Sequence, residues 1–281
     1  MDIWNQKNLG HQWKTLALGK QQAMLSKISK FVSKKNKSKI VCLTAYSKNI
    51  VEELDKFTDL ILVGDSLGSV LYNYKSTRNV TLDTMIEHSK SVRLGITKSL
   101  MIVDMPYNTY RNKKQALRNC KKVIKETKCD GVKLEGGLKI VKIIKILVKN
   151  KIPVMGHLGI LPQSTKGKFK SKGKSAKEIK ELIRDSKLLE QAGVFSMVLE
   201  CVEKKLAKKI TKSASIPTIG IGSSNNCDGQ VLVTDDILGL TDSKIKFVKK
   251  FANIKKVINS GVKKFKKEVK SKKYPTKKHS Y

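Results

Sequence analysis

The chain alternates short apolar runs with longer amphipathic segments, and this alternation constrains its fold more than any other feature. Eight runs of about four to eight residues have the character of buried β-strands, and the charged segments among them have helical spacing. Strands that alternate with helices form parallel sheets whose faces the helices cover. We therefore predict an α/β fold, a (β/α)8 barrel of the TIM type. The expected strands are 39–46, 60–65, 99–104, 131–135, 153–157, 196–201, 217–221 and 230–234, and the expected helices lie near 48–57, 83–96, 113–127, 138–149, 175–192, 202–213 and 243–262.

The segments outside this pattern suggest three parts. Residues 1–25 are predicted to form a helical arm that closes the bottom of the barrel or contacts a neighbour, 26–262 the catalytic barrel, and 263–281 a basic tail. Residues 164–175 are rich in Gly, Ser and Lys and follow the fifth strand, which predicts a mobile loop on the catalytic face. Asp83 is the expected N-cap of the second helix.

The net charge of +36 suggests nucleic acid as a partner. Only five of the 59 basic residues are arginine, however, and lysine lacks the planar fork used for bidentate recognition of bases and phosphates. Aromatic residues make up 6% of the chain and do not interleave with the basic runs, so no stacking platform is visible. We expect a solvated lysine surface and no specific nucleic acid, with non-specific affinity for anionic surfaces as the alternative.

Hydropathy and cysteine usage bear on location. No apolar run reaches the roughly 18 to 20 residues that span a bilayer, and the N-terminal segment lacks the apolar core of a secretory signal. The five cysteines contain no C-x-x-C pair, which argues against a disulfide framework or a zinc knuckle. We expect a cytoplasmic protein without a membrane partner.

Two aspartates end apolar runs, in the sequences LVGD and MIVD. Aspartate is unfavourable in strands, so Asp65 and Asp104 need a reason for their positions. Capping of the following turn is one reading. The other is a Mg²⁺ site, because Mg²⁺ binds one or two carboxylates together with water and substrate oxygens. The C-terminal ends of barrel strands converge on one face, which would bring both aspartates together.

Four further polar residues are expected at that face. Lys133 and Glu135 are two residues apart on one strand and therefore share a face. They form either a buried ion pair or a site in which Lys133 binds an anionic substrate and Glu135 serves the metal. Glu200 ends SMVLE and is the candidate general base, although it could be an ordinary helix-start glutamate. His157 is a candidate hydrogen-bonding partner of the substrate, or a core histidine.

With these motifs together, the chain resembles the ketopantoate hydroxymethyltransferase (3-methyl-2-oxobutanoate hydroxymethyltransferase) family. The likeness covers residues 24–281 in the order and spacing of the family. The matching segments are LTAY (43–46), LVGDSLG (62–68), ST..VT (76–81), DMP (104–106), VKLEGG (132–137), GHLG.LPQS (156–164), LECV (199–202), IPTIGIG (216–222), DGQ.LV.DD.LG (228–239) and YP...HS near the C-terminus.

The resemblance implies a reaction and a division of roles. A hydroxymethyl group would pass from 5,10-methylenetetrahydrofolate to 3-methyl-2-oxobutanoate, giving ketopantoate on the route to pantothenate and coenzyme A. Asp65 and Asp104 would bind Mg²⁺ with help from Glu135, and Ser66 and Lys133 would hold the substrate carboxylate. Glu200 would remove the proton beside the ketone. The resemblance also implies a homo-oligomer, a decamer.

The chain departs from the family pattern in two places. The loop after the fifth strand is KGKFKSKGK (166–174) where the family has a Gly-Gly-Tyr segment followed by Val-Gln-Gly, and Lys75 replaces an acidic residue. Both departures bear on folate affinity, lid motion or subunit contacts. The alternatives are another Mg²⁺-dependent 2-oxo-acid barrel of the phosphoenolpyruvate mutase and isocitrate lyase type, which the missing K-x-x-C-G-H loop disfavours, or a basic nucleic-acid-binding protein.

Overall fold

The computed structural model describes residues 19, 22, 24–165 and 170–281. Most of the predicted arm and residues 166–169 of the predicted loop lie outside these described residues. The chain divides into two compact units, Met1–Val231 and Leu232–Tyr281. The domain boundaries expected after residues 25 and 262 stay predictions.

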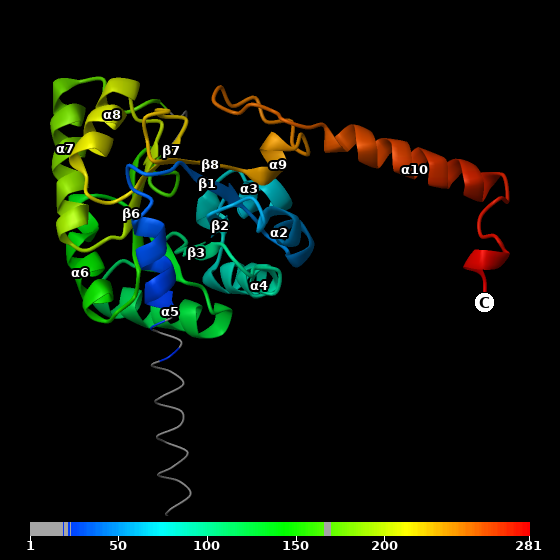
Figure 1. The fold of residues 1–281 in the computed structure, drawn as a ribbon, viewed down its shortest axis with the longest axis horizontal. Helices are drawn as coiled ribbons and strands as arrows, with labels where there is room; N and C mark the ends of the chain where they lie inside the picture. Colours follow the sequence, from blue (N-terminus) through cyan, green and yellow to red (C-terminus); the bar gives the residue numbers. More distant parts are fainter. Residues whose placement is uncertain (1–18, 20–21, 23, 166–169) are drawn as a thin grey trace, which may run out of the picture. The chain divides into compact units, whose positions relative to one another are not determined.

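Eight parallel strands close into a barrel, and each strand pairs with the next one in the sequence (Figure 1). The predicted (β/α)8 fold and all eight predicted strands are therefore confirmed. Every residue of β2 is buried, because helices cover its outer face and the other strands enclose its inner face. The strands are β1 (Ile40–Thr44), β2 (Leu60–Val63), β3 (Leu100–Asp104), β4 (Gly131–Glu135), β5 (Val154–Gly159), β6 (Ser196–Glu200), β7 (Thr218–Ile221) and β8 (Gly229–Leu232).

Alternate strand residues build two separate cores. In β2, Ile61 and Val63 join the large core between the barrel and its helices, whereas Leu60 and Leu62 join the core inside the barrel. This division follows from the period of two that places successive strand side chains on opposite faces. The helices of this unit are α2 (Lys48–Leu54), α3 (Leu67–Tyr72), α4 (Leu82–Arg93), α5 (Lys113–Thr127), α6 (Val141–Lys149), α7 (Ala176–Gln191) and α8 (Lys204–Ser213), with 3₁₀ turns η1 (Thr77–Asn79) and η2 (Leu138–Ile140).

A helical segment that includes residues 24–32 closes the end of the barrel at which the strands begin. Its Ile28 and Phe31 pack into the inner core, and the ring of Phe31 meets that of Phe195 edge-on with centroids 5.8 Å apart. Phe195 directly precedes β6, so this contact lies at the N-terminal end of the strands. That end is therefore sealed by apolar side chains.

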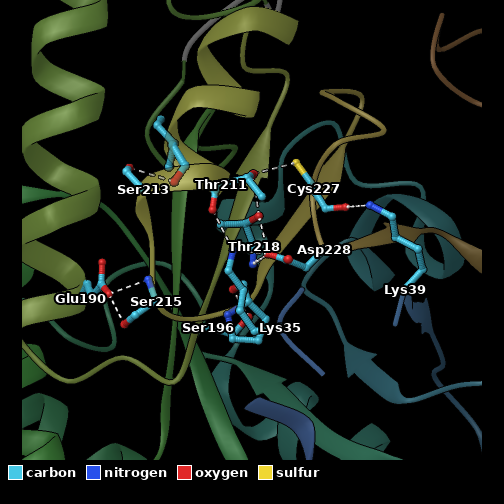
Figure 2. Close-up of polar contacts among 12 residues, drawn as sticks. Lys35, Lys39, Glu190, Ser196, Thr211, Ser213, Ser215, Thr218, Cys227 and Asp228 are labelled. Atoms are coloured by element: carbon cyan, nitrogen blue, oxygen red, sulfur yellow. Dashed lines mark hydrogen bonds and ion pairs between the residues drawn. The ribbon is translucent and has the colours of Figure 1, made fainter. Parts of the chain in front are cut away.

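Three aspartates, two of them buried and one partly exposed, link neighbouring strands at the same end. Each precedes an even-numbered strand and accepts a backbone N–H near the start of the strand before it, at 2.8–2.9 Å. The pairs are Asp59 with Val41, Asp130 with Met101, and Asp228 with Thr218. Figure 2 shows the last pair, in which the Lys35 ammonium also binds Asp228 at 2.7 Å. At Asp130 and Asp228, which are buried, these contacts satisfy polar groups that would otherwise be costly to bury.

The second unit contains α9 (Thr234–Ile237), α10 (Ile254–Lys270) and the 3₁₀ turn η3 (Lys277–His279). No residue of α10 is buried, and its apolar side chains recur at helical spacing. Val257, Val262 and Phe265 are 65%, 60% and 56% exposed, and Ile258 and Val269 are also exposed. Among the described residues, no helix has the length and apolar character needed to span a membrane.

Two local expectations need correction, and two short helices were missed. The predicted N-cap Asp83 is wrong, because the cap is Thr81, whose hydroxyl accepts the Thr84 N–H at 3.1 Å and starts α4 earlier. The helix predicted at 243–262 is displaced, since α10 begins at Ile254 and continues to Lys270. The short helices α3 and α9 were not predicted, because segments of six and four residues carry little periodic signal.

Candidate active site

The C-terminal ends of five consecutive strands deliver the predicted site residues to one place. Asp65 follows β2, Asp104 ends β3, Lys133 and Glu135 lie on β4, and the remaining two residues come from β5 and β6. The register between neighbouring strands places Asp104 opposite Lys133 and Glu135 opposite His157. Polar residues at strand ends thus become a cluster through barrel closure, as in other TIM-type enzymes. The other two residues are His157 and Glu200.

Asp65 and Asp104 lie against each other and are 5% and 3% exposed. The Asp65 N–H donates to Oδ2 of Asp104 at 3.2 Å. Oδ1 of Asp104 is buried and makes no hydrogen bond, although the Lys133 ammonium is 3.2 Å away as an ion pair. Burial and then the Asp104 carboxylate raise the pKa of Asp65 to about 7.

This pair of carboxylates fits a divalent cation. A cation would relieve the repulsion between the two aspartates and meet the Asp104 oxygen that has no hydrogen bond. Within the described residues, no three His, Cys, Asp or Glu side chains are placed to hold a metal together. Mg²⁺ suits such a site, because it commonly takes only one or two protein carboxylates and completes its octahedron with water and substrate oxygens.

Lys133 remains charged in this buried setting. Burial disfavours its ammonium, but Asp104, Glu135 and Asp65 together raise its pKa above the ordinary value. Burial also raises the pKa of Glu135 well above its ordinary value, and Lys133 opposes that effect. Lys133 is therefore a fixed positive charge beside three carboxylates, as an anion-binding residue at this site would require.

His157 connects Lys133 to Glu200. Its Nδ1 lies 3.2 Å from the Lys133 ammonium, and its Nε2 lies 3.1 Å from Oε2 of Glu200 without the alignment of a hydrogen bond. Burial and then Lys133 lower the pKa of His157, which favours the neutral ring. Because an ammonium can only donate, Nδ1 is the acceptor, and the ring proton of the neutral form is on Nε2. The Glu200 side chain is 16% exposed, so it also reaches solvent.

Ser66 lies beside Asp65 at the start of α3. Its hydroxyl is 2.8 Å from the Tyr46 hydroxyl, and Tyr46 belongs to the segment that follows β1. This contact places Ser66 on the same face of the barrel as the carboxylates. All six residues predicted for the site, and Ser66 with them, thus occupy the C-terminal end of the strands.

Comparison with known proteins agrees with the motifs. The family model described as ketopantoate hydroxymethyltransferase matches residues 25–277. A 3-methyl-2-oxobutanoate hydroxymethyltransferase of Pelagibacter ubique is 66% identical over 258 residues, covering 92% of this chain and 100% of that protein. A protein of the same name from Clostridium botulinum is 47% identical over 264 residues, with 92% and 96% of the chains covered.

The chain belongs to the ketopantoate hydroxymethyltransferase family. The resemblance found in the sequence is confirmed, and the protein is an enzyme, a hydroxymethyltransferase. Among solved structures, a phosphonopyruvate hydrolase in complex with oxalate and Mg²⁺ matches with a TM-score of 0.58 at 10% identity, covering 92% of this chain and 93% of that one. A 2,3-dimethylmalate lyase matches with a TM-score of 0.57 at 12% identity, with 92% of both chains covered. These two likenesses show a common fold.

Sequence reasoning missed two members of this site, the buried Gln163 and the partly buried Tyr110. Gln163 is 2% exposed and donates to Oδ2 of Asp65 at 2.8 Å, and the Tyr110 hydroxyl donates to Oε1 of Gln163 at 2.6 Å. Gln163 stands in the segment GHLG.LPQS, which supported the family resemblance, but a neutral amide on a loop gave no chemical signal. Tyr110 lies between β3 and α5 and carried no signal either.

The described part of the predicted loop 164–175 is held by backbone hydrogen bonds. Lys172 donates its N–H to the Cys201 carbonyl at 2.9 Å and accepts the Glu203 N–H at 2.8 Å. The segment near Lys172 therefore follows the chain just beyond β6. The family departure in KGKFKSKGK lies partly outside the described residues, so its effect on the loop stays a prediction.

Proposed function

We propose that this hydroxymethyltransferase transfers a hydroxymethyl group from 5,10-methylenetetrahydrofolate to 3-methyl-2-oxobutanoate in a Mg²⁺-dependent reaction that gives ketopantoate. The observation that carries the proposal is the buried pair Asp65 and Asp104 beside Lys133, at the strand ends of a member of this family. The pair suits a cation and the lysine suits a carboxylate. A 2-oxo acid offers both the chelating oxygens and the negative charge that such a site would bind.

Asp65 and Asp104 would hold the metal in this proposal. Bound there, Mg²⁺ would act as a Lewis acid toward the oxygens of the 2-oxo acid. Glu135 would act on the metal from further out, because its Oε2 accepts the Gln163 N–H at 3.1 Å and its Oε1 lies 3.7 Å from His157. Carboxylates in such positions commonly act through water or through the groups that bind the metal.

Three other residues would divide the remaining work. Lys133 and Ser66 would bind the substrate carboxylate, and Glu200 would remove the proton from the carbon beside the ketone. The new carbon nucleophile would then form a bond to the methylene carbon while the bonds from that carbon to the folate nitrogens break. Water would supply the hydroxyl oxygen, and tetrahydrofolate would leave. His157 would act on Glu200 by proximity, because its Nε2 lies 3.1 Å from the carboxylate that must receive the substrate proton.

Transfer can be followed by NMR with ¹³C-labelled methylenetetrahydrofolate and 3-methyl-2-oxobutanoate. We expect labelled ketopantoate with Mg²⁺, none after treatment with EDTA, and recovery when Mg²⁺ is restored. Phosphonopyruvate and 2,3-dimethylmalate should remain unchanged under the same conditions. Turnover that is undiminished by EDTA would contradict the metal role, and cleavage of either control compound would favour the mutase and lyase type of activity.

We also propose that the enzyme is a cytoplasmic homo-oligomer, a decamer as the resemblance implies. The exposed apolar side chains of α10 support assembly, because such a stripe gains free energy when a partner covers it. Five free cysteines, four of them buried, support a reducing compartment. Sedimentation velocity with a Val262→Lys variant tests the assembly: dissociation is expected, and an unchanged sedimentation coefficient would exclude α10 from the interface.

A further inference from the structure

Gln163 occupies the centre of the carboxylate cluster although it lies on a loop after β5. Its side-chain amide donates to Oδ2 of Asp65 at 2.8 Å and to the Met105 carbonyl at 3.0 Å. Both amide hydrogens are therefore used. The amide thus engages only one of the two carboxylate oxygens of Asp65.

Tyr110 fixes which way the Gln163 amide points. The Tyr110 hydroxyl donates to Oε1 of Gln163 at 2.6 Å and is 3.4 Å from the Glu135 N–H, which donates to it. Reversing the amide would place its oxygen against the Asp65 carboxylate and the Met105 carbonyl, both of which are acceptors. Only one orientation of the amide therefore satisfies its neighbours.

The main chain of Gln163 is held as firmly as its side chain. Its N–H donates to Oε2 of Glu135 at 3.1 Å, and its carbonyl accepts Nε of Arg78 at 2.7 Å. The Arg78 guanidinium in turn lies over the Tyr107 ring, 4.8 Å from its centroid. One residue thus contacts Asp65 through its amide and Glu135 through its backbone, so it fixes two carboxylates relative to each other.

We propose that Gln163 is a positioning residue that holds Asp65 and Glu135 in the arrangement that binds the metal, with Tyr110 locking its amide. The inference rests on the proposed metal-dependent function. A glutamine suits this role because it orients a carboxylate without supplying a positive charge, so Asp65 keeps its full attraction for a cation. A lysine or arginine at this position would satisfy Asp65 and compete with the metal.

The variants Gln163→Ala, Gln163→Glu and Tyr110→Phe test this role on the full-length protein. Gln163→Glu keeps the size of the side chain but replaces the donor with an acceptor, and Tyr110→Phe removes a single oxygen. Gln191→Glu, on an exposed helix end, and Tyr74→Phe, whose side chain is exposed, are matched controls. The readouts are the Kd for Mn²⁺ by calorimetry, the thermal midpoint, and turnover as a function of metal concentration.

We expect both Gln163 variants to weaken Mn²⁺ binding by about 10- to 100-fold, the usual range for groups that orient metal ligands. Tyr110→Phe should weaken it by roughly tenfold, with turnover recovering at saturating Mn²⁺, while the controls stay at the wild-type Kd. Such recovery separates positioning from a catalytic role and from a loss of folding. Wild-type Mn²⁺ affinity in Gln163→Glu and Tyr110→Phe would overturn the inference, whatever happens to the thermal midpoint. Failure of the wild-type protein to bind Mn²⁺ or to depend on metal would instead refute the proposed function itself.

Discussion

Two buried carboxylates at opposite ends of the barrel have pKa values shifted in opposite directions. Asp55 at the end where the strands begin and Asp65 at the end where they finish are each 5% exposed. Asp55 accepts the N–H groups of Thr97, Lys98 and Ser99 at 2.8–2.9 Å and also the Thr97 hydroxyl. Burial alone would raise the pKa of Asp55, but these hydrogen bonds outweigh it and hold the pKa below its ordinary range. At Asp65, with one amide donor and a second carboxylate nearby, the pKa rises to about 7.

Burial by itself therefore does not decide what a carboxylate does. Where backbone donors surround it, the charge is stabilised and ties neighbouring segments together. Where donors are few and like charges are close, the charged form is destabilised, and a bound cation would relieve this unfavourable interaction. The first arrangement serves stability, and the second suits a site that must bind a cation.

The largest expected effect is at Glu200. Glu200→Gln keeps the shape of the side chain but cannot accept a proton, so solvent deuterium exchange beside the ketone should fall by about 10² to 10⁴. Mg²⁺-dependent substrate binding should persist, because Asp65 and Asp104 are unchanged. The exchange is measured by NMR with Mg²⁺ and without folate. Undiminished exchange would identify another base, with His157 the first suspect.

The next effect is on the metal. Asp65→Asn and Asp104→Asn should each weaken Mn²⁺-dependent substrate binding by at least about 10- to 100-fold, because a neutral amide is a poorer ligand for a hard cation. Each variant should also keep or raise the thermal midpoint of the metal-free protein, since one of two repelling buried charges is lost. Titration calorimetry measures the metal-dependent binding of substrate, and scanning calorimetry measures the thermal midpoint. If either variant binds metal like the wild type, the assignment of the metal site is wrong.

Asp55→Asn should show the reverse behaviour. It should lower the free energy of unfolding by about 2 to 3 kcal/mol, because hydrogen bonds to a charged acceptor are lost, while the Kd for Mn²⁺ stays unchanged. Asp83→Asn on the exposed surface of α4 is the matched control and should alter neither quantity. A loss of metal affinity in Asp55→Asn would show that the two ends are coupled.

The pH dependence of this variant follows from the lowered pKa of Asp55. An aspartate with a depressed folded-state pKa contributes stability above its unfolded pKa of about 3.9 and loses it as the pH falls toward the folded value. The stability difference between wild type and Asp55→Asn should thus be full near pH 7 and shrink below about pH 4. Thermal melts from pH 7 to pH 3 measure it, and a difference that grows on acidification would contradict the argument.

The smallest expected effect concerns the lysine surface, which belongs to neither end. Binding to duplex DNA should be weak, independent of sequence and largely absent at about 200 mM salt, as for contacts with phosphates alone. A filter-binding titration at several salt concentrations measures this. Sequence discrimination that persists at the higher salt concentration would revive nucleic acid as a partner of this enzyme.

Much of the candidate site at the C-terminal ends of the strands could be predicted because its signal is local. An apolar run that ends in LVGD or MIVD predicts a buried strand with an unusual aspartate at its end. Closure of a parallel barrel then brings such strand ends together. The end of the barrel at which the strands begin has no comparable signal in the sequence. In the sequence, Asp55, Asp130 and Asp228 look like ordinary loop aspartates. Their contribution to stability depends on hydrogen bonds from backbone N–H groups 10 to 44 residues away.

The sequence by itself determined the order of strands and helices, the barrel, the family, and the residue types presented at the strand ends. These follow from periodicity and motif spacing, which are properties of neighbouring residues. The tertiary structure alone decided that Lys133 meets His157, that Oδ1 of Asp104 has no hydrogen bond, and that Gln163 enters the cluster from a loop. These contacts depend on strand register and on the path of a loop through space, and neither has a period that a sequence can display.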